Sequence, residues 1–354
     1  MNSFRCVLVC LLLWTFAVAQ VGARALSTTR DGRHDFDFHF GSWKTHISRL
    51  THAPDGTPHW VTLDGTVVIR KIWDGRANLE EVKADGEGGH FEDLALFLYD
   101  PKAHQWSIHF AGSDDGTIVA PATVGQFQNG RGEFFDQELR NGKSVLVRMI
   151  WSNITPDSHD FEQAFSSDGG QTWETNFTAS LTRAEPAPPT SVAPRSPEPA
   201  DPDGQDAFDF AQGTWHEHTS RLVHPLTGSH TWIQMDGVSV DKPVWNGRAN
   251  LVELESDGPK GHLELLSLRL YNPQSRQWNL YFATSPVGVL SDAMTGGFQN
   301  GRGEFFAQDT VDGRTVLVRF TVAKLSATSA LSEQAFSADG GKTWEVNWIN
   351  RYTR

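Results

Sequence analysis

The stretch Phe-Gln-Asn-Gly-Arg-Gly-Glu-Phe-Phe at residues 127–135 returns without a single change at residues 298–306. Each copy places Asn-Gly, the strongest short-range hairpin signal, between segments rich in aromatic residues. The pattern predicts two antiparallel strands joined by a tight turn. Its recurrence in the second half of the sequence predicts that the whole chain is duplicated.

Further motifs recur in the same order and at a nearly constant offset. The repeated segments are Phe36–Trp43 with Phe208–Trp215, Trp73–Leu79 with Trp245–Leu251, and Gln163–Glu174 with Gln334–Glu345. Two copies at so long a period indicate domain duplication, since a solenoid needs shorter and more numerous units. We expect two homologous domains, 31–183 and 207–354, joined by a proline-rich linker at 184–206.

Within each copy, apolar residues alternate with polar ones between turn signals. Leu94, Leu96 and Leu98 show this period of two, and so do their counterparts Leu266, Leu268 and Leu270. Such alternation is typical of strands, and the turn spacing predicts eight to ten strands per copy. The fold class is therefore all-β, as either a barrel or a sandwich. Unit length and simple hairpin succession favour an antiparallel barrel, which is wide enough inside for one small ligand.

Composition excludes several classes of protein. The 354 residues are 38% apolar, too many for a disordered chain. Lys and Arg number 30 against 43 Asp and Glu, a formal net charge of -13. Nucleic acids and anionic membranes both attract a basic face, so we expect neither as a partner.

Residues 1–19 read as a secretory signal peptide. A single positive charge, Arg5, precedes the apolar run Cys6–Phe16, and Ala17-Val18-Ala19 forms a small-residue cleavage site. The alternative is an uncleaved anchor, although the run is short for a bilayer and no later stretch is long enough. We expect a secreted or periplasmic protein without stable membrane insertion. Both cysteines, Cys6 and Cys10, would be removed, which excludes disulfides and thiol catalysis.

The motif Phe-Asp-Phe-x-x-Gly-Ser/Thr-Trp opens each copy and Asp-Gly-Gly-x-Thr-Trp-Glu closes it. Together they resemble the lipocalin-like, calycin-type domains of unknown function found in bacterial exported proteins. The resemblance implies a barrel with a small-ligand cavity. It also implies that Trp43 and Trp215 pack across the barrel floors. It implies no catalytic residue.

Ser166-x-Asp168-x-Gly170-x-Thr172-Trp173, with its copy at residues 337–344, matches the Asp-box of sialidases and related propellers. In those proteins the motif is a hairpin turn rather than a catalytic element. One box per copy is too few for a propeller, which needs several blades. We interpret it as structural.

The leading functional hypothesis is binding of a small hydrophobic or amphipathic molecule, carboxylate-bearing ligands included, with one site per barrel or one at the interface of the barrels. Besides Trp43 and Trp215, the ligand-binding candidates are Arg148 and Arg319 as anion partners, and Gln163 and Gln334 as polar selectors. Arg148 alternates with Leu146 and Ile150, which predicts that it shares one strand face with them. A buried guanidinium must meet a ligand anion or a structural carboxylate, so a bracing Arg–Glu network is the alternative.

Two other classes stay open. A tandem-barrel enzyme of the hydratase, isomerase or cyclase type would need acid–base groups. The catalytic candidates are His46, His218, Glu81 and Glu253, all at repeated positions. A structural envelope module would instead have filled barrels. Repeated histidines with Glu92 and Glu264 suggest a metal site only weakly, and we expect neither a metal nor a cofactor.

Overall fold

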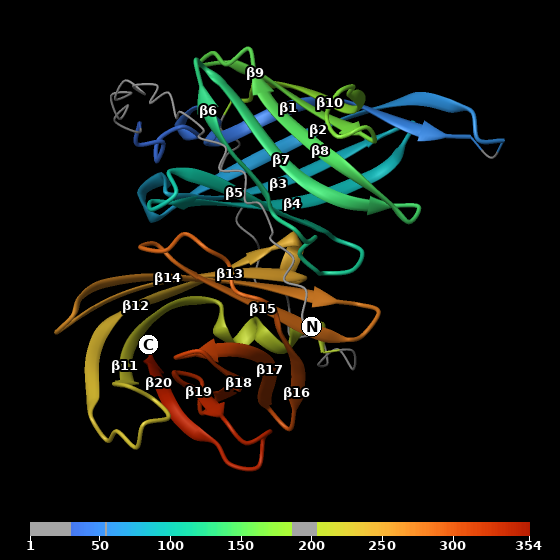
Figure 1. Cartoon of the computed structure of the whole chain (residues 1–354). Coiled ribbons are helices and arrows are strands. Elements are labelled where there is room, and N and C mark those ends of the chain that lie inside the picture. Colours follow the sequence, from blue (N-terminus) through green and yellow to red (C-terminus); the bar gives the residue numbers. More distant parts are fainter. Residues whose placement is uncertain (1–29, 54, 186–203) are drawn as a thin grey trace, which may run out of the picture. The chain divides into compact units, whose positions relative to one another are not determined.

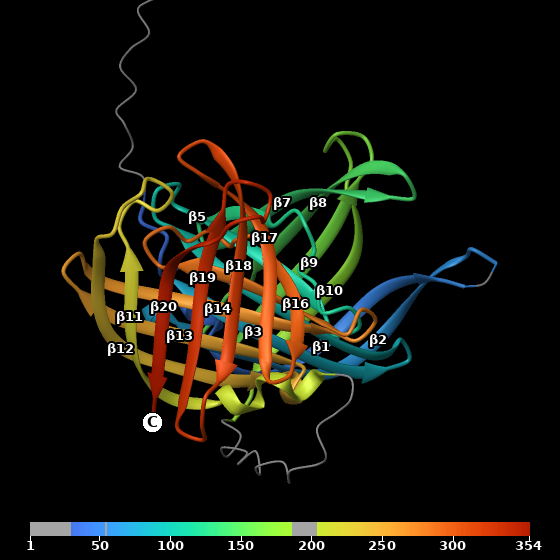
Figure 2. The same ribbon diagram turned by 90° about the horizontal axis from the view of Figure 1, so that it is seen from below.

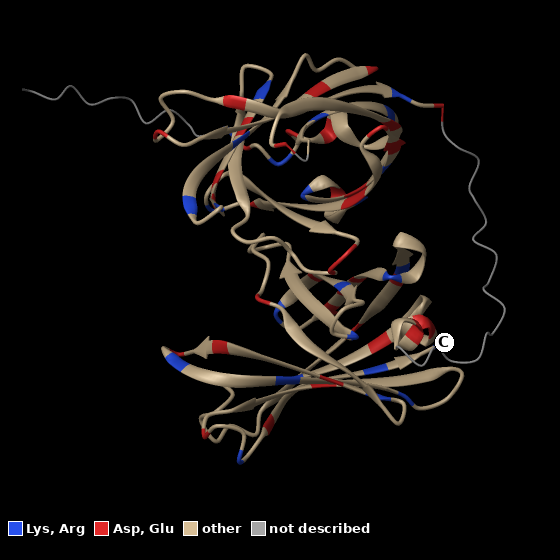
Figure 3. Ribbon diagram, turned by 90° about the vertical axis from the view of Figure 1, so that its right-hand side faces the viewer, with Lys and Arg blue, Asp and Glu red and all other residues tan. Residues whose placement is uncertain are grey.

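The computed structural model describes residues 30–53, 55–185 and 204–354. The predicted signal peptide and most of the predicted linker lie outside the described residues. Among those described, no helix is long and apolar enough to span a bilayer. Figure 3 shows Lys and Arg scattered among Asp and Glu along the strands and loops.

Ten antiparallel strands form the first barrel (Figure 1). They are β1 (Gly41–His52), β2 (Pro58–Ile72), β3 (Ala77–Gly86), β4 (Gly89–Asp100), β5 (Gln105–Gly112), β6 (Thr123–Gln128), β7 (Arg131–Arg140), β8 (Lys143–Ser152), β9 (Ser158–Ser166) and β10 (Glu174–Arg183). Each strand pairs with the next along the chain, and β10 pairs with β1. The sheet is therefore closed and leaves no free edge.

The second barrel repeats this topology (Figure 2). Its strands are β11 (Gly213–Leu222), β12 (Trp232–Val244), β13 (Ala249–Gly258), β14 (Gly261–Asn272), β15 (Gln277–Thr284), β16 (Met294–Gln299), β17 (Arg302–Val311), β18 (Arg314–Lys324), β19 (Ser329–Ser337) and β20 (Glu345–Thr353). β20 closes on β11. Two closed ten-stranded barrels in tandem confirm the predicted fold class and fit the lipocalin-like architecture.

Short 3-10 helices precede and interrupt these strands. They are η1 (Asp37–His39), η2 (Trp73–Gly75), η3 (Gln205–Ala211) and η4 (Trp245–Gly247). Phe36, just before η1, is 0% exposed, and its ring lies against those of Phe97, Trp106 and Trp151. These aromatic edge-to-face contacts fill one end of the first barrel.

The two Asp-box motifs form the hairpin turns between β9 and β10 and between β19 and β20. Ser166 Oγ accepts from the Gly170 N–H at 2.8 Å, and Asp168 Oδ1 accepts from the Thr172 N–H at 3.0 Å. The Trp173 indole donates to the Gly170 carbonyl at 3.1 Å. The turn in the second copy has the same bonds. This confirms that the motif is structural in this chain, because its polar atoms are used in the turn itself.

The alternating leucines of β4 and β14 lie on the outside of the barrels rather than inside. Leu94, Leu96 and Leu98 nevertheless have 0% exposure. They belong to one hydrophobic cluster with Leu266, Leu268 and Leu270 of the second barrel. Both barrels lie within the single unit Asp31–Arg354. β4 and β14 are therefore buried on both faces, and the outer apolar faces stabilise the pairing of barrels.

Reciprocal ion pairs join the barrels beside this cluster. Arg76 Nη2 lies 2.8 Å and 2.7 Å from the two carboxylate oxygens of Glu264. At the equivalent positions, Arg248 pairs with Glu92, which Lys83 also contacts at 3.0 Å. Burial would raise the pKa of Glu92, but the bonds from Arg248 and Lys83 outweigh it and leave that pKa lowered. Glu92 and Glu264 therefore hold the barrels together rather than ligating a metal.

Two glycines allow loops of each barrel to touch the other. Gly116 has φ 58°, and a Cβ there would lie 2.0 Å from the carbonyl oxygen of Tyr271. Gly288 has φ 64°, and a Cβ there would lie 1.9 Å from the carbonyl oxygen of Tyr99. Only glycine satisfies both the positive φ and the close approach.

The ion pairs predict equivalent losses of stability in the two halves. Arg76→Met and Arg248→Met should each lower the free energy of unfolding by about 1–3 kcal/mol at pH 7, since each leaves a buried carboxylate without its arginine. Because the pKa values of Glu92 and Glu264 are lowered, this contribution is present above the ordinary carboxyl pKa and lost as pH falls below it. Urea unfolding at pH 7 and pH 3 measures both effects.

Arg131→Met is the matched control, because Arg131 forms an exposed pair with Glu133. It should cost less than about 1 kcal/mol. Equal losses for Arg131→Met and Arg76→Met would contradict a stabilising role for the pairs between barrels.

Candidate functional site

Each barrel encloses a cavity formed by the inward-facing side chains of its strands. The cavity of the first barrel measures about 380 Å³ and that of the second about 300 Å³. Both volumes lie at the lower end of the range for small-molecule sites. A module with filled barrels would lack them.

An indole and a guanidinium close the floor of each barrel. Trp43 is 0% exposed, its Nε1 donates to the His39 carbonyl at 2.7 Å, and Arg183 lies over its ring at 4.0 Å. Trp215 and Arg354 repeat the 4.0 Å stacking. The two tryptophans therefore lie at the barrel floors, as the resemblance implied. They do not line the cavities themselves, but pack beneath residues that do.

Two imidazoles face each other above the floor of the first barrel. His39 Nε2 lies 3.0 Å from Glu80 Oε2, while the His159 ring lies 5.0 Å from the His39 ring, centroid to centroid. His159 is 1% exposed, and neither of its ring nitrogens has a hydrogen-bond partner among the described residues. Burial lowers the pKa of His159 to about 2, so the ring is neutral and offers one donor and one acceptor.

A buried carboxyl group, that of Asp93, lies in the same cavity. Burial, with a smaller contribution from the charge of Glu80, raises the pKa of Asp93 to about 7. The backbone N–H of Leu94 donates to it at 3.0 Å. Glu80 on β3 and Asp93 on β4 thus make this side of the cavity polar, while Ile47, Val67 and Leu181 on β1, β2 and β10 are apolar.

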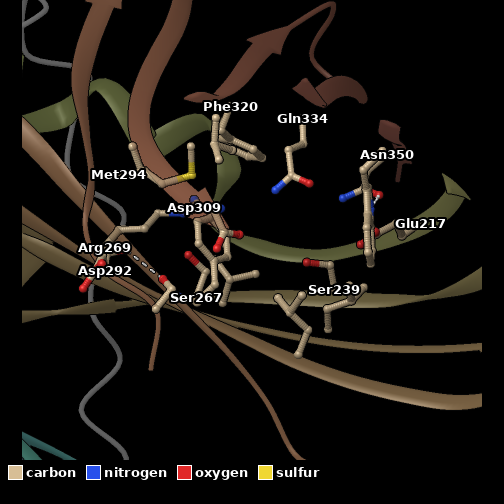
Figure 4. Close-up of a pocket in the computed structure, with 18 of the residues that line it drawn as sticks. Glu217, Ser239, Ser267, Arg269, Asp292, Met294, Asp309, Phe320, Gln334 and Asn350 are labelled. Carbon is tan, nitrogen blue, oxygen red and sulfur yellow. Dashed lines mark hydrogen bonds between the residues drawn. The ribbon is translucent and has the colours of Figure 1, made fainter. Parts of the chain in front are cut away.

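The second cavity carries a different polar group, Glu217 on β11 (Figure 4). Glu217 is 3% exposed and its Oε1 accepts from Thr219 Oγ1 at 2.8 Å, while Oε2 has no partner within the described part of the chain. Burial raises the pKa of Glu217 to about 7, more than the bond from Thr219 lowers it. Asn350 and Tyr352 on β20 extend this network. Asn350 Oδ1 lies 2.9 Å from Thr219 Oγ1 and shares the single hydroxyl hydrogen of Thr219 with Glu217 Oε1, while the Asn350 amide nitrogen donates to the Tyr352 hydroxyl at 3.1 Å.

A buried ion pair lies at another side of this cavity. Arg269 Nη1 donates to Asp241 Oδ2 at 3.0 Å, and the guanidinium lies 4.4 Å from the centre of the Phe208 ring. Burial raises the pKa of Asp241 despite the opposing charge of Arg269. The pair neutralises itself and leaves little positive charge for a ligand.

Several polar groups in each cavity have an apolar or less polar counterpart in the other barrel. In the first barrel they are His39, Glu80, Asp93 and His159, whose counterparts in the second are Ala211, Val252, Leu265 and Ala330. In the second barrel they are Glu217, Ser239, Asn350 and Tyr352, whose counterparts in the first are Thr45, Val67, Ala179 and Leu181. The duplication has therefore kept the scaffold and exchanged the chemistry of the cavity.

Gln163 and Gln334, predicted as polar selectors, do line the two cavities. Figure 4 shows the Gln334 amide directed into the second cavity. These are the two predicted ligand-binding residues that the structure brings into the cavity linings.

Arg148 and Arg319 lie on the outer faces of their strands, away from the cavities. Each stacks on the tryptophan of an Asp-box, with Arg148 4.6 Å from the Trp173 ring and Arg319 4.6 Å from the Trp344 ring. Arg148 does share a face with its apolar neighbours, but that face is the outer one, because Met149 and the other odd-numbered residues of β8 point inward. The prediction that these arginines face the interior is wrong for that reason.

His46 and His218 also lie on the outer faces. His46 Nδ1 is 2.8 Å from Asp64, and His218 Nδ1 is 2.7 Å from Asp236, with both histidine side chains about half exposed. Their repetition reflects a repeated cross-strand pair on the surface. The structure brings neither of them to a cavity.

Glu81 and Glu253 occupy outer positions as well, where Glu81 pairs with Arg70 and Glu253 with Lys242, both at 2.8 Å. The residue one place earlier, Glu80, is the one that points inward. A one-residue difference in position reverses the face in a strand, so the repeated glutamate was the wrong candidate for the cavity.

Sequence reasoning missed His39, His159 and Glu217. Repetition drew attention to shared residues, whereas these three differ between the copies. A polar residue that replaces an apolar one within a repeated strand is the signal that would have found them. Among the described residues, no group of three or more His, Cys, Asp or Glu is placed to hold a metal ion.

Comparison with known proteins gives distant likenesses. No family model matches the chain. It is 23% identical to an invertase of Debaryomyces hansenii over 184 residues, which are 52% of this chain and 30% of that protein. The chain therefore spans under a third of that relative.

Among solved structures, an S-type phycobiliprotein lyase, CpeS, of Guillardia theta is 11% identical, with TM-score 0.30, over 45% of this chain and 96% of that one. A protein of unknown function of the DUF3598 family from Nostoc punctiforme is 11% identical, with TM-score 0.26, over 92% and 99%. At these values the likenesses carry no argument, and the proposals below rest on the geometry of this chain.

The buried carboxyl of Glu217 predicts a specific dependence of stability on pH. Its folded-state pKa is raised, so its contribution is full below the unfolded pKa near 4.5 and is lost as pH rises through about 7. Glu217→Gln removes this titration. Between pH 4.5 and pH 8, wild type should therefore lose about 3 kcal/mol relative to the variant in urea unfolding.

Glu253→Gln, on the outer face of β13, is the control for this measurement. Its unfolding free energy should run parallel to that of wild type between pH 4.5 and pH 8. Parallel curves for wild type and Glu217→Gln would show that Glu217 is ionised in the folded protein throughout this range.

Proposed function

We propose that the chain binds small amphipathic molecules, one in the cavity of each barrel. The observation that carries this proposal is a buried polar group in each cavity that has no hydrogen-bond partner within the described part of the chain: the ring nitrogens of His159 in the first and Glu217 Oε2 in the second. Leaving such an atom buried and unpaired costs about 1–3 kcal/mol, which a ligand with a matching polar group would recover.

The charges around the cavities bear on the kind of ligand. The anion partners expected from the sequence, Arg148 and Arg319, lie outside. Carboxyl side chains outnumber guanidinium groups in both linings: Glu80, Asp93, Asp136 and Glu138 against Arg49 and Arg140, and Glu217, Asp292 and Asp309 against Arg269. A ligand with a neutral or positively charged polar end therefore fits better than a carboxylate.

Cavity-filling variants test the proposal with a neutral apolar fluorophore, N-phenyl-1-naphthylamine. Ala179→Trp should fill the first cavity and Ala307→Trp the second, because both side chains line them. We expect titration of wild type to give one probe per barrel, each single variant to lose one site, and the double variant to lose both.

Ser180→Trp is the matched control, because Ser180 follows Ala179 on β10 and is exposed on the outer face. It should keep both sites. Undiminished probe binding by the double variant, or no binding by wild type, would contradict cavity binding.

A second candidate function is proton transfer in the first barrel. The 3.0 Å contact between His39 and Glu80, beside the unpartnered ring of His159, favours it, because a histidine oriented by a carboxylate is a common acid–base device. Extraction of co-purifying ligand, followed by incubation with wild type or with His39→Ala, tests it. Conversion by wild type alone supports turnover, and conversion by neither supports binding only.

We also propose that the chain is exported, on the strength of the apolar run and the cleavage site within residues 1–19. N-terminal sequencing of protein from the source cells tests this. A mature end directly after Ala19, or after the second small-residue site at Ala25, is the expected result, and an intact Met1 would contradict it.

A further inference from the structure

The lining of the second cavity contains more acidic than basic side chains. Three carboxyl side chains, Glu217, Asp292 and Asp309, belong to the lining (Figure 4). The one guanidinium in that lining, that of Arg269, donates to Asp241 at 3.0 Å and lies over the Phe208 ring. Asp241 therefore balances the positive charge of Arg269, while the Nε of Arg269 has no hydrogen-bond partner among the described residues.

Glu217 is the innermost of these groups with a free oxygen. It is 3% exposed, whereas Asp292 and Asp309 are exposed. Its Oε1 is taken by Thr219, and its Oε2 has no partner among the residues that the structure describes. A buried carboxylate without a partner is costly, and it becomes favourable once a cation donates hydrogen bonds to it.

Aromatic side chains on β15, β18 and β20 contribute to the lining of the same cavity. Phe282, Phe320 and Trp348 all line the cavity, and the first two pack edge to face with 5.7 Å between ring centroids. Ring faces attract cations, so a cavity whose lining combines aromatic rings with a buried carboxylate suits an organic ammonium group. The amide of Gln334 adds an oxygen that can accept a hydrogen bond from it.

We propose that the cavity of the second barrel binds an organic cation: a protonated primary amine carried on an apolar ring or chain. The ammonium group donates to Glu217, and the apolar part lies against Phe282, Phe320 and Trp348. This inference rests on the proposed function and assigns a chemical class to one of its two sites.

The first barrel lacks this arrangement. Thr45 stands at the position of Glu217, and two arginines, Arg49 and Arg140, enter the lining. The chain thus contains its own comparison, a homologous cavity that has no carboxyl group at the position of Glu217 and has Arg49 in its lining. We expect one amine site per chain and not two.

Binding of the amine should depend on pH through Glu217. The other titratable or charged groups around it are Tyr352 on β20, Asp241 on β12, Arg269 on β14, and Asp292 and Asp309 at the lining. Glu217 must ionise to receive the ammonium group, and its pKa in the empty cavity is about 7. The ionised fraction, and with it the affinity, should therefore rise about tenfold from pH 6 to pH 8.

The experiment is calorimetric titration of the full chain with three matched compounds: 4-phenylbutylamine, 4-phenylbutan-1-ol and 4-phenylbutyrate. We expect the amine to bind with one site per chain, at least tenfold more tightly than the alcohol and more tightly still than the carboxylate. Amine affinity should rise from pH 6 to pH 8, while that of the alcohol should not. Glu217→Gln should weaken amine binding on the order of 30-fold and weaken alcohol binding far less.

Two controls keep the test decisive. Glu253→Gln, on the outer face, should not alter amine binding. Urea unfolding of Glu217→Gln shows that its barrels are folded, and the pH dependence in wild type needs no variant at all.

The outcomes separate this inference from the proposed function. Equal affinity for the amine and the alcohol, or amine binding unaffected by Glu217→Gln, overturns the cation site while cavity binding stands. If neither the three compounds nor the naphthylamine probe binds to wild type, the proposed function falls as well.

Discussion

Alternation of inward and outward side chains around a closed sheet is the constraint on which the rest of this structure depends. Once β10 pairs with β1 and β20 with β11, no strand can slip without reversing every side chain it carries. The cavity linings, the floors and the outer contact between barrels all follow from that parity. Glu80 and Glu81 illustrate this constraint. Glu80 points into the cavity and contacts His39, whereas the adjacent Glu81 points outward and pairs with Arg70.

The outer face of the closed sheet is as important as the inner one. β4 and β14 bury leucines outside and aromatic or polar residues inside, so neither barrel presents its outer apolar stripe to water. Arg76 and Arg248 then pair with carboxylates of the opposite barrel. The same outer surface of each barrel forms this contact, so each interaction occurs twice.

Duplication also explains how the two cavities came to differ. The floors, Asp-boxes and outer pairs are common to both copies because they close and brace a barrel. Residues that line the cavities do not close or brace the barrel, so they can differ between the copies. Ala330 stands at the position equivalent to His159, and Thr45 at the position equivalent to Glu217. Polar lining residues of one barrel thus correspond to apolar residues of the other, as Asp93 does to Leu265. This separation favours two ligands of different chemistry rather than two copies of one site.

The sequence by itself determined the duplication, the all-β class, the tandem barrels and the structural role of the Asp-boxes, because these depend on local turn chemistry and on a period of two that is readable along the chain. It also placed Gln163 and Gln334 in the cavities. It did not determine which face of each strand is inside, since a period of two is the same for both faces and an apolar face can pack against a second barrel as well as against a core. Arg148, His46 and Glu81 were misplaced for that reason. Only the tertiary structure brought His39 and His159 together in the first barrel. Only the tertiary structure placed Glu217 beside Tyr352, with Oε2 unpaired among the described residues. Both contacts join segments that are distant in sequence, and closure of the sheet fixes how those segments pair.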